Sequence, residues 1–274
     1  MDLTVDINAY CNLRCEFCYQ DLDGSILPED EILGIIDENP DSEYIEIGGG
    51  EPFLDKRLVQ LIKEIRKRKK KIHIATNGTR FPDELLNLED MIRNDVEIQI
   101  SLHASNQELY KRITKKNLFD RVIDNIKKIK PMYSTLISSA IYQVNYHDIP
   151  NLINLASELE LPIRINLVFP VGNGRNVELL TPKQINQLTS YLLLERIKKG
   201  NMVESPLMHT NNCTALQNVY GIEKKGLCPV DCGVKGYISP KGKSYNCEFL
   251  QNELLTIEGA KWTYHKAWKI MQGW

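Results

Sequence analysis

The 274-residue sequence contains no long hydrophobic run and no strong excess of either charge. No apolar stretch reaches the roughly 18 residues that indicate a membrane-spanning helix, and no charged segment followed by an apolar one marks a secretory signal. Lys and Arg total 34 and Asp and Glu 36, so the net charge of −2 offers no general attraction for nucleic acid or anionic lipid. We therefore expect a cytoplasmic protein with neither a membrane nor a nucleic acid as partner.

The long middle of the chain lacks cysteine, because the 7 cysteines fall into two groups. Three lie near the amino terminus, and four lie in the last 62 residues, at Cys213, Cys228, Cys232 and Cys247. The cytosol keeps thiols reduced, so this pattern indicates metal ligation and disfavours disulfides. The division predicts two separate metal centres.

The amino-terminal group, Cys11, Cys15 and Cys18 in CNLRCEFCY, has the spacing Cys-x3-Cys-x2-Cys. Thiolates hold iron–sulfur clusters, and three ligands instead of four leave one iron of a cubane open for chemistry. Half of a zinc site is the alternative, although zinc ribbons usually present paired Cys-x2-Cys knuckles. The triplet therefore predicts an iron–sulfur cluster with an open iron.

A glycine-rich turn follows the apolar strand pattern of residues 43–47, in the run EYIEIGGGEPFLD. Its glycines allow a ligand to approach the backbone closely, although a plain strand-to-helix turn would use glycine too. The triplet, the aromatic Phe17 before its last cysteine, the preceding LTVDINAY and this turn together resemble the radical S-adenosylmethionine (radical SAM) superfamily. The resemblance implies that the triplet holds a catalytic [4Fe-4S] cluster. It also implies that Gly49, Gly50, Glu51 and Pro52 bind S-adenosylmethionine, with Glu51 on its methionyl ammonium.

Apolar strand patterns alternate with amphipathic helical patterns over the first two thirds of the chain. This cadence predicts α/β architecture, with an open, partial (β/α)6 barrel over residues 1–200. Ligands of such sheets bind beyond the carboxyl ends of the strands, where both motifs lie. The expected strands are 3–9, 43–47, 71–76, 95–102, 135–143 and 163–169. The expected helices are 28–38, 56–69, 82–93, 106–129, 148–159 and 181–198.

Further cofactor contacts are implied by the resemblance at the ends of later strands. These candidates are Phe17, Asn77 in ATNGT, Ser101 in ISLHAS, Asn145, and Val168 in LVFPVG, where backbone could meet the adenine. For each of these residues, a satisfied polar group or a turn at a strand end is the alternative. His103 is expected to be structural rather than a proton donor.

The tail reads CGVKGYISPKGKSYNCEFL from Cys232, with a hairpin signal at Ser239-Pro240-Lys241-Gly242. It resembles the opening half of the SPASM extension of radical SAM enzymes. The later cysteines of that pattern are absent, which points to the shorter twitch form over residues 201–274. By this resemblance, the four tail cysteines hold one auxiliary [4Fe-4S] cluster, and a structural zinc site is the alternative.

The resemblance implies reductive cleavage of S-adenosylmethionine to a 5′-deoxyadenosyl radical that abstracts a substrate hydrogen. We expect a peptide or protein side chain as substrate, giving an oxidised, thioether or carbon–carbon crosslinked product. The absence of room before the first strand for a leader-binding winged helix weakens this expectation. A small-molecule dehydrogenase and a two-cluster electron-transfer or assembly protein remain alternatives. The electron donor is expected to be flavodoxin or ferredoxin, for which the basic run 66–71 is a secondary docking candidate beside its expected role as a solvated helix end.

Overall fold

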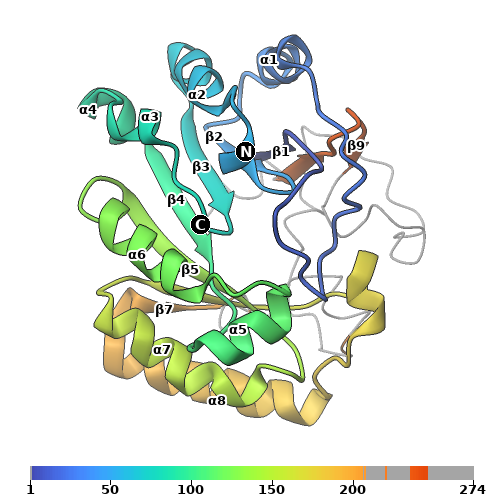
Figure 1. Ribbon diagram of the computed structural model, residues 1–274, viewed down its shortest axis with the longest axis vertical. Helices are drawn as coiled ribbons and strands as arrows, with labels where there is room; N and C mark the ends of the chain where they lie inside the picture. Colours follow the sequence, from blue (N-terminus) through green and yellow to red (C-terminus); the bar gives the residue numbers. More distant parts are fainter. Residues whose placement is uncertain (1, 206, 208–219, 221–234, 246–274) are drawn as a thin grey trace, which may run out of the picture.

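A computed structural model describes residues 2–205, 207, 220 and 235–245 (Figure 1). Its centre is a nine-stranded sheet with the order β7-β6-β5-β4-β3-β2-β1-β8-β9. All neighbouring strands are parallel except β8 and β9. The strands are β1 Asp2–Asp6, β2 Tyr44–Gly48, β3 Lys71–Thr76, β4 Val96–Ser101, β5 Ser134–Ile141, β6 Ile163–Leu167, β7 Val203–Glu204, β8 Lys235–Ile238 and β9 Ser244–Tyr245.

The helices cover the outer side of the curved sheet, with α1 and α2 near its first strands and α7 and α8 near its later ones (Figure 1). This arrangement confirms the expected partial (β/α)6 barrel. The α-helices are α1 Glu29–Glu38, α2 Leu58–Lys67, α3 Asp83–Leu86, α4 Asp90–Arg93, α5 Gln107–Thr114, α6 Phe119–Ile129, α7 Ile149–Glu158 and α8 Pro182–Lys199. Short 3-10 helices are η1 Pro52–Leu54, η2 Tyr146–Asp148, η3 Gly172–Asn176 and η4 Gly200–Met202.

Alternation along the strands separates the hydrophobic core from a polar interior. In β4, Val96, Ile98 and Ile100 are buried in the core, whereas the intervening Gln99 and Ser101 line an inner cavity. Successive side chains of a strand point to opposite faces, so one strand can serve both sides. The helices supply the facing apolar surface, as in α2, where Leu58, Leu61, Ile62 and Ile65 are fully buried.

Two expected helices are interrupted. The segment expected to be helical over 106–129 divides into α5 and α6, because Lys115 ends α5 with a left-handed backbone, at φ 62°. The segment 82–93 likewise forms two short helices, α3 and α4. The helix expected at 181–198 is continuous and starts with a capping box, in which Thr181 and Gln184 each bond the other's backbone.

The described part of the tail confirms the expected hairpin. Gly242 adopts φ +71° in its turn, and Ser239 N–H donates to Lys243 O at 2.9 Å. The first hairpin strand, β8, pairs in parallel with β1, so the hairpin extends the barrel sheet. The domain boundary expected at residue 200 stays a prediction. The tail cysteines Cys213, Cys228, Cys232 and Cys247 lie outside the described residues.

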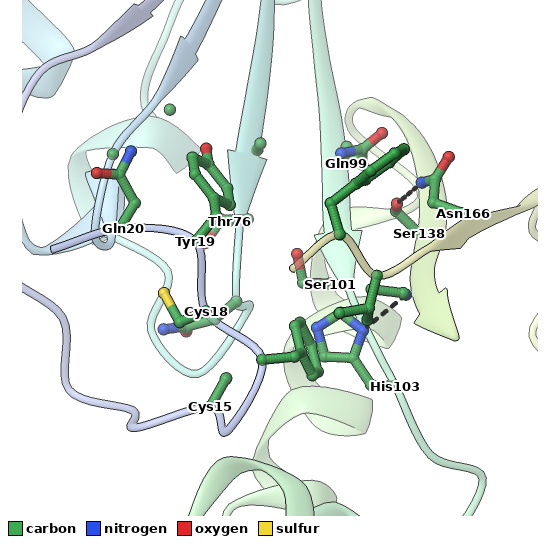
Figure 2. A pocket seen from close by; sticks show the side chains of 18 of the residues that line it. Cys15, Cys18, Tyr19, Gln20, Thr76, Gln99, Ser101, His103, Ser138 and Asn166 are labelled. Carbon is green, nitrogen blue, oxygen red and sulfur yellow. Dashed lines mark hydrogen bonds between the residues drawn. The ribbon is translucent and has the colours of Figure 1, made fainter. Parts of the chain in front are cut away.

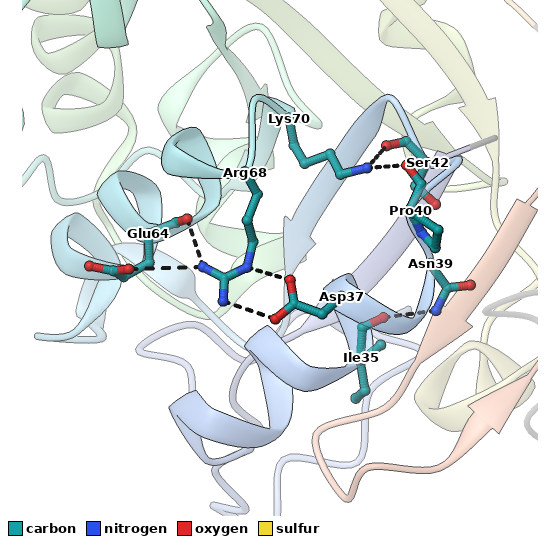
Figure 3. Close-up of polar contacts among 8 residues, drawn as sticks. All are labelled: Ile35, Asp37, Asn39, Pro40, Ser42, Glu64, Arg68 and Lys70. Atoms are coloured by element: carbon teal, nitrogen blue, oxygen red, sulfur yellow. Dashed lines mark hydrogen bonds and ion pairs between the residues drawn. The ribbon is translucent and has the colours of Figure 1, made fainter.

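The basic run 66–71 connects the end of α2 to the segment after α1 (Figure 3). Arg68 pairs with Asp37, Nε to Oδ1 at 2.7 Å, and donates to Glu64 O at 3.0 Å. Lys70 donates to the carbonyl oxygens of Pro40 and Ser42. These cations are therefore largely occupied by the chain's own acceptors, as expected for a helix end. Within the described residues, no helix is long and apolar enough to cross a membrane.

Candidate active site

A cavity of about 560 Å³ opens inside the sheet and reaches the carboxyl ends of its strands. Figure 2 places Cys15, Cys18, Tyr19 and Gln20 on one side of it and Gln99, Ser138 and Asn166 on the other. The lining includes all three amino-terminal cysteines and Gly48, Gly49 and Gly50. The cysteine triplet and the glycine turn, 30 or more residues apart in the chain, thus face one space.

Three neighbouring segments hold the loop that carries the cysteines. From α5, the carbonyls of Thr114 and Ile113 accept from Arg14 N–H at 3.1 Å and Glu16 N–H at 3.2 Å. On the β3 side, Asn12 Nδ2 donates to Thr79 Oγ1 at 2.8 Å. From η3, Asn173 N–H donates to Cys18 O at 2.9 Å. The loop is therefore fixed at several points along its length.

The cysteine thiols lie in a partly buried environment with little access to solvent. Burial raises the pKa of Cys11 to about 11 and raises the pKa values of Cys15 and Cys18 as well. Leu13 N–H at 3.4 Å and Asn77 Nδ2 at 3.5 Å donate to Cys11 Sγ. Thiolates at such positions need a positive partner, which a metal supplies.

The three cysteine thiols are donors of the kind that hold an iron–sulfur cluster. In a cubane each thiolate binds a different iron, so the three sulfurs stand farther apart than around one zinc. The three cysteines are also free of disulfides and line the same cavity. The donor set therefore suits a [4Fe-4S] cluster.

The glycine turn is packed against the segment that leads into the cysteine loop. Gly50 N–H donates to Asn8 O and Glu51 N–H to Tyr10 O, both at 2.8 Å. A Cβ at Gly49 would stand 2.5 Å from Asn8 O, and one at Gly50 would overlap the backbone of Tyr10. Close packing of two backbones thus accounts for these glycines, and it also leaves their outer side facing the cavity.

Glu51 is fully buried and does not line the cavity. Its carboxylate accepts hydrogen bonds from Thr76 Oγ1 at 2.5 Å, Asn77 N–H at 2.6 Å and Phe53 N–H at 2.9 Å. Burial raises the pKa of this carboxyl to about 7 despite these donors. In the structure the side chain ties the end of β2 to the end of β3, and its expected contact with the methionyl ammonium stays a prediction.

The other predicted cofactor residues divide into two groups. Phe17, Asn77, Ser101 and Val168 line the cavity. Asn145 and Pro52 are buried outside its lining. The Asn145 amide is occupied, since Nδ2 donates to His103 O at 2.9 Å and Oδ1 accepts from Tyr142 N–H at 2.9 Å. Its placement gives no support to a cofactor contact and indicates a role in bracing the end of β5.

His103 is a buried part of the cavity wall. Its Nδ1 accepts a hydrogen bond from Ala140 N–H at 3.1 Å, so the neutral ring carries its proton on Nε2. Burial lowers its pKa to about 4. The ring meets Phe17 edge to face, with centroids 4.8 Å apart. These contacts favour the expected structural role, in which His103 orients Phe17 beside the cysteines.

Two features of the site were not anticipated from the sequence. Gly172 and Gly174 bring η3 onto the cysteine loop, and a Cβ at Gly172 would lie 2.6 Å from Cys18 O. The second feature is a buried network in which Gln20, two residues after Cys18, bonds Asp6 and Tyr237 of β8. The two glycines in PVGNG could have indicated the close packing of η3 on the cysteine loop. No local sequence pattern indicated the buried network of Gln20.

The wall opposite the cysteines carries several polar side chains among apolar ones. Asn166 Nδ2 donates to Ser138 Oγ at 3.0 Å, as Figure 2 shows. Arg164, on the same strand β6, approaches Gln99 Oε1 at 3.4 Å. On the side of the cysteines, Thr4 Oγ1 of β1 donates to Glu46 Oε2 of β2 at 3.0 Å. The opposite wall can receive a ligand that carries several hydrogen-bonding groups.

Relatives of the chain include enzymes that carry the name GTP 3′,8-cyclase. The chain is 29% identical over 219 residues to the GTP 3′,8-cyclase of Clostridium perfringens strain 13, a match that covers 74% of this chain and 64% of the relative. It is 30% identical over 180 residues to the probable GTP 3′,8-cyclase of Methanocaldococcus jannaschii, covering 62% and 59%. The matches thus span less than two thirds of the length of these relatives.

Solved structures with the same fold align with nearly all of the chain. SuiB of Streptococcus suis bound to the precursor peptide SuiA has a TM-score of 0.71 at 17% identity, covering 92% of this chain and 60% of SuiB. The enzyme anSMEcpe with bound AdoMet has a TM-score of 0.70 at 16% identity, covering 92% and 75%. At these identities the likeness concerns the fold.

A family model described as the radical SAM superfamily matches residues 5–156, more than half of the chain. This range contains the cysteine triplet, the glycine turn and strands β2 to β5. The chain therefore belongs to the radical SAM superfamily, whose enzymes work with a [4Fe-4S] cluster and S-adenosylmethionine.

Proposed function

We propose that this protein is a radical SAM enzyme that reductively cleaves S-adenosylmethionine and removes a hydrogen atom from a substrate held inside the barrel. The observation that carries the proposal is that Cys11, Cys15, Cys18 and the glycine turn line one cavity. When bound, the reduced cluster and S-adenosylmethionine supply a 5′-deoxyadenosyl radical as the hydrogen-abstracting agent. The protein binds and orients both reactants and keeps water away.

Each side of the cavity has a part in this proposal. The three thiolates hold the cluster, and Asn77 steadies Cys11 through its amide. The backbone of Gly49 and Gly50 offers polar groups to the methionyl end of the cofactor, while Glu51 keeps that backbone fixed to β3. Ser101 is assigned to a ribose or carboxylate contact, the backbone at Val168 to the adenine, and Phe17 to packing beside them.

For the substrate, we favour a peptide or protein side chain, which would be oxidised or joined through a thioether or carbon–carbon bond. Support comes from the polar side chains of Gln99, Ser138 and Asn166 on the cavity wall, which can form hydrogen bonds with the polar groups of a peptide. Further support comes from a likeness of fold to SuiB, which was crystallised with a precursor peptide. Incubation of the reduced enzyme with peptides encoded beside it, followed by mass spectrometry, tests this choice.

A small-molecule substrate is the second candidate. It is favoured by the relatives in Clostridium perfringens and Methanocaldococcus jannaschii, whose names specify GTP. Adding GTP to the reduced enzyme and analysing the products by mass spectrometry distinguishes the two candidates. A cyclised nucleotide would replace the peptide proposal.

The tail is proposed to hold an auxiliary [4Fe-4S] cluster through Cys213, Cys228, Cys232 and Cys247. The hairpin β8–β9, which stands between the last two of these cysteines in sequence, supports a twitch-like arrangement over residues 201–274. A structural zinc site predicts zinc in place of iron, and metal analysis after anaerobic reconstitution distinguishes the two.

The decisive experiment for the enzyme class is the formation of 5′-deoxyadenosine. The anaerobically reconstituted protein is reduced with dithionite in the presence of S-adenosylmethionine, and the products are quantified by chromatography. Formation of 5′-deoxyadenosine supports the enzyme. Its absence in a protein with full iron content would favour the alternative of an electron-transfer or assembly protein.

A further inference from the structure

Five exposed cations lie within the cysteine loop or on the α5 segment that is hydrogen-bonded to it. Arg14 lies within the loop, between Cys11 and Cys15. The others lie at the carboxyl end of α5 and just after it. We define these residues as the α5 patch: Arg14, Lys111, Arg112, Lys115 and Lys116.

The α5 patch adjoins the loop through direct hydrogen bonds. Arg14 N–H donates to Thr114 O at 3.1 Å, and Glu16 N–H donates to Ile113 O at 3.2 Å. The carbonyls that accept these bonds belong to the last turn of α5, between Arg112 and Lys115 in sequence. The helix that carries the α5 patch is therefore bonded directly to the backbone on either side of Cys15.

Most of this positive charge is available to a partner. The acid that contacts the α5 patch is Glu16, and its carboxylate is occupied by Lys115 Nζ at 2.6 Å and by Tyr142 Oη. Within the described residues, Lys111, Arg112 and Lys116 form no ion pair. The whole chain carries a net charge of −2, so this concentration of cations departs from the average surface.

The basic run of α2 differs in this respect, although it is richer in cations in the sequence. Arg66 pairs with Asp95, Lys67 with Glu64, Arg68 with Asp37 and Lys71 with Glu43. Charges that are already neutralised contribute little to the attraction of a partner. The sequence therefore pointed to a region whose cations have partners, while the α5 patch keeps its charge.

We propose that the α5 patch is the docking surface for an acidic one-electron carrier protein of the flavodoxin or ferredoxin class. This inference rests on the proposed function, which needs one electron for each cleavage of S-adenosylmethionine. The docked carrier is oxidised by one electron, and the cluster held by Cys11, Cys15 and Cys18 is reduced by one. That electron then passes to the sulfonium, whose carbon–sulfur bond breaks to methionine and the 5′-deoxyadenosyl radical. Charge complementarity speeds such encounters and weakens as salt increases.

The test compares two charge-reversal variants of equal size. K111E/K116E changes the α5 patch and leaves Arg14, Arg112 and Lys115 in place. K63E/K183E makes the same charge change at exposed lysines of α2 and α8. Binding of oxidised flavodoxin to each reconstituted protein is measured by calorimetry in about 50 mM and 300 mM salt. Reduction of the cluster by flavodoxin hydroquinone is followed by its visible absorbance.

We expect K111E/K116E to bind flavodoxin at least about tenfold more weakly at low salt and to be reduced correspondingly more slowly. The wild-type protein should lose most of its affinity at high salt, and K63E/K183E should match the wild type. The proposal would be overturned if K111E/K116E bound flavodoxin as tightly as the wild type, or if both variants lost the same affinity. Failure of both flavodoxin and ferredoxin to bind the wild-type protein would overturn it as well.

Dithionite separates failure of this proposal from failure of the proposed function. Because it is a small chemical reductant, it should support equal 5′-deoxyadenosine formation in the wild type and both variants. No 5′-deoxyadenosine from the wild type would reject the enzyme itself, whereas equal flavodoxin binding with normal dithionite activity would reject only the docking surface. If K111E/K116E is unstable, K111Q/K116Q provides the same comparison, with an expected loss of about threefold.

Discussion

The hydroxyl of Tyr237 in β8 donates a hydrogen bond to Oδ2 of Asp6 in β1 at 2.6 Å, across 231 residues of sequence. Gln20 Nε2 reaches the same carboxylate and lies 3.2 Å from the Tyr237 hydroxyl. All three side chains are buried. The tail hairpin is thereby joined to the strand that leads into the cysteine loop and to the residue that follows that loop.

Replacing Tyr237 with Phe should lower the free energy of unfolding by about 1.5–3 kcal/mol, because the buried Asp6 carboxylate loses a charge-assisted donor. Urea unfolding of the anaerobic protein measures this loss. Tyr44→Phe is the control, since Tyr44 is 41% exposed and its hydroxyl contacts only Lys71 among the described residues. Equal stability of the two variants would contradict a stabilising role for the Tyr237–Asp6 bond.

Replacing Cys11, Cys15 and Cys18 together with Ala should leave about half of the roughly eight irons expected per chain with two clusters. It should abolish 5′-deoxyadenosine formation, since only a cluster with an open iron can bind S-adenosylmethionine. Iron analysis and the dithionite assay measure both effects. Loss of all the iron from a folded triple variant would contradict two independent sites.

Glu51→Gln should change how stability depends on pH. Burial raises the pKa of Glu51 to about 7, so between about pH 4.5 and 7 the folded protein keeps a proton that the unfolded chain has released. As the pH rises through this window, the free energy of unfolding of the wild type should therefore fall by about 3 kcal/mol relative to the variant. His103, with its pKa lowered to about 4, contributes with the opposite sign in both proteins and cancels in the difference.

Urea unfolding at half-unit steps from pH 4 to 8 provides this comparison. Parallel stability curves for the wild type and Glu51→Gln would show that folding does not shift the pKa of Glu51. Glu51→Ala in addition removes the acceptor for Thr76, Asn77 and Phe53. We expect it to weaken S-adenosylmethionine binding about ten- to a hundredfold with iron content intact, and an unchanged affinity would mean that the carboxylate has no part in the cofactor site.

Cys247→Ala tests the tail. If the four tail cysteines hold an auxiliary cluster, this change opens one of its irons and alters its spectrum and potential. We expect 5′-deoxyadenosine formation to persist while the product of the true substrate is lost. Full product formation, or zinc in the unmodified protein, would make the tail site structural.

Regular patterns in the sequence predicted most of the barrel. The alternation in β4, from Val96 to Ser101, separates its core face from its cavity face, and the three cysteines grouped by their spacing line the same cavity. The break between α5 and α6 was not predicted, because Lys115 adopts a left-handed backbone that usually signals glycine. A motif or a periodic pattern predicts backbone geometry from the usual preferences of its residues, and the turn at Lys115 departs from those preferences.

The orientation of individual side chains was harder to predict. The glycine turn identified Glu51 as a site residue, but only the structure places its carboxylate among donors from Thr76, Asn77 and Phe53. Asn145 resembled a cavity residue because it follows a strand, and its amide instead bonds the backbone around it. Strand ends can be located from a sequence, whereas the direction of a polar side chain depends on partners far along the chain.

The parallel pairing of β8 with β1 has a consequence for synthesis of the chain. Until β8 is made, β1 has pairing only from β2, and its other backbone edge stays open. The ribosome adds about 5–20 residues per second, so the 231 residues from Asp6 to Tyr237 take roughly 12–46 s. For that interval the nascent barrel exposes an unpaired strand beside its cysteine loop. We therefore expect ribosome-bound intermediates to be the forms most prone to edge-to-edge aggregation.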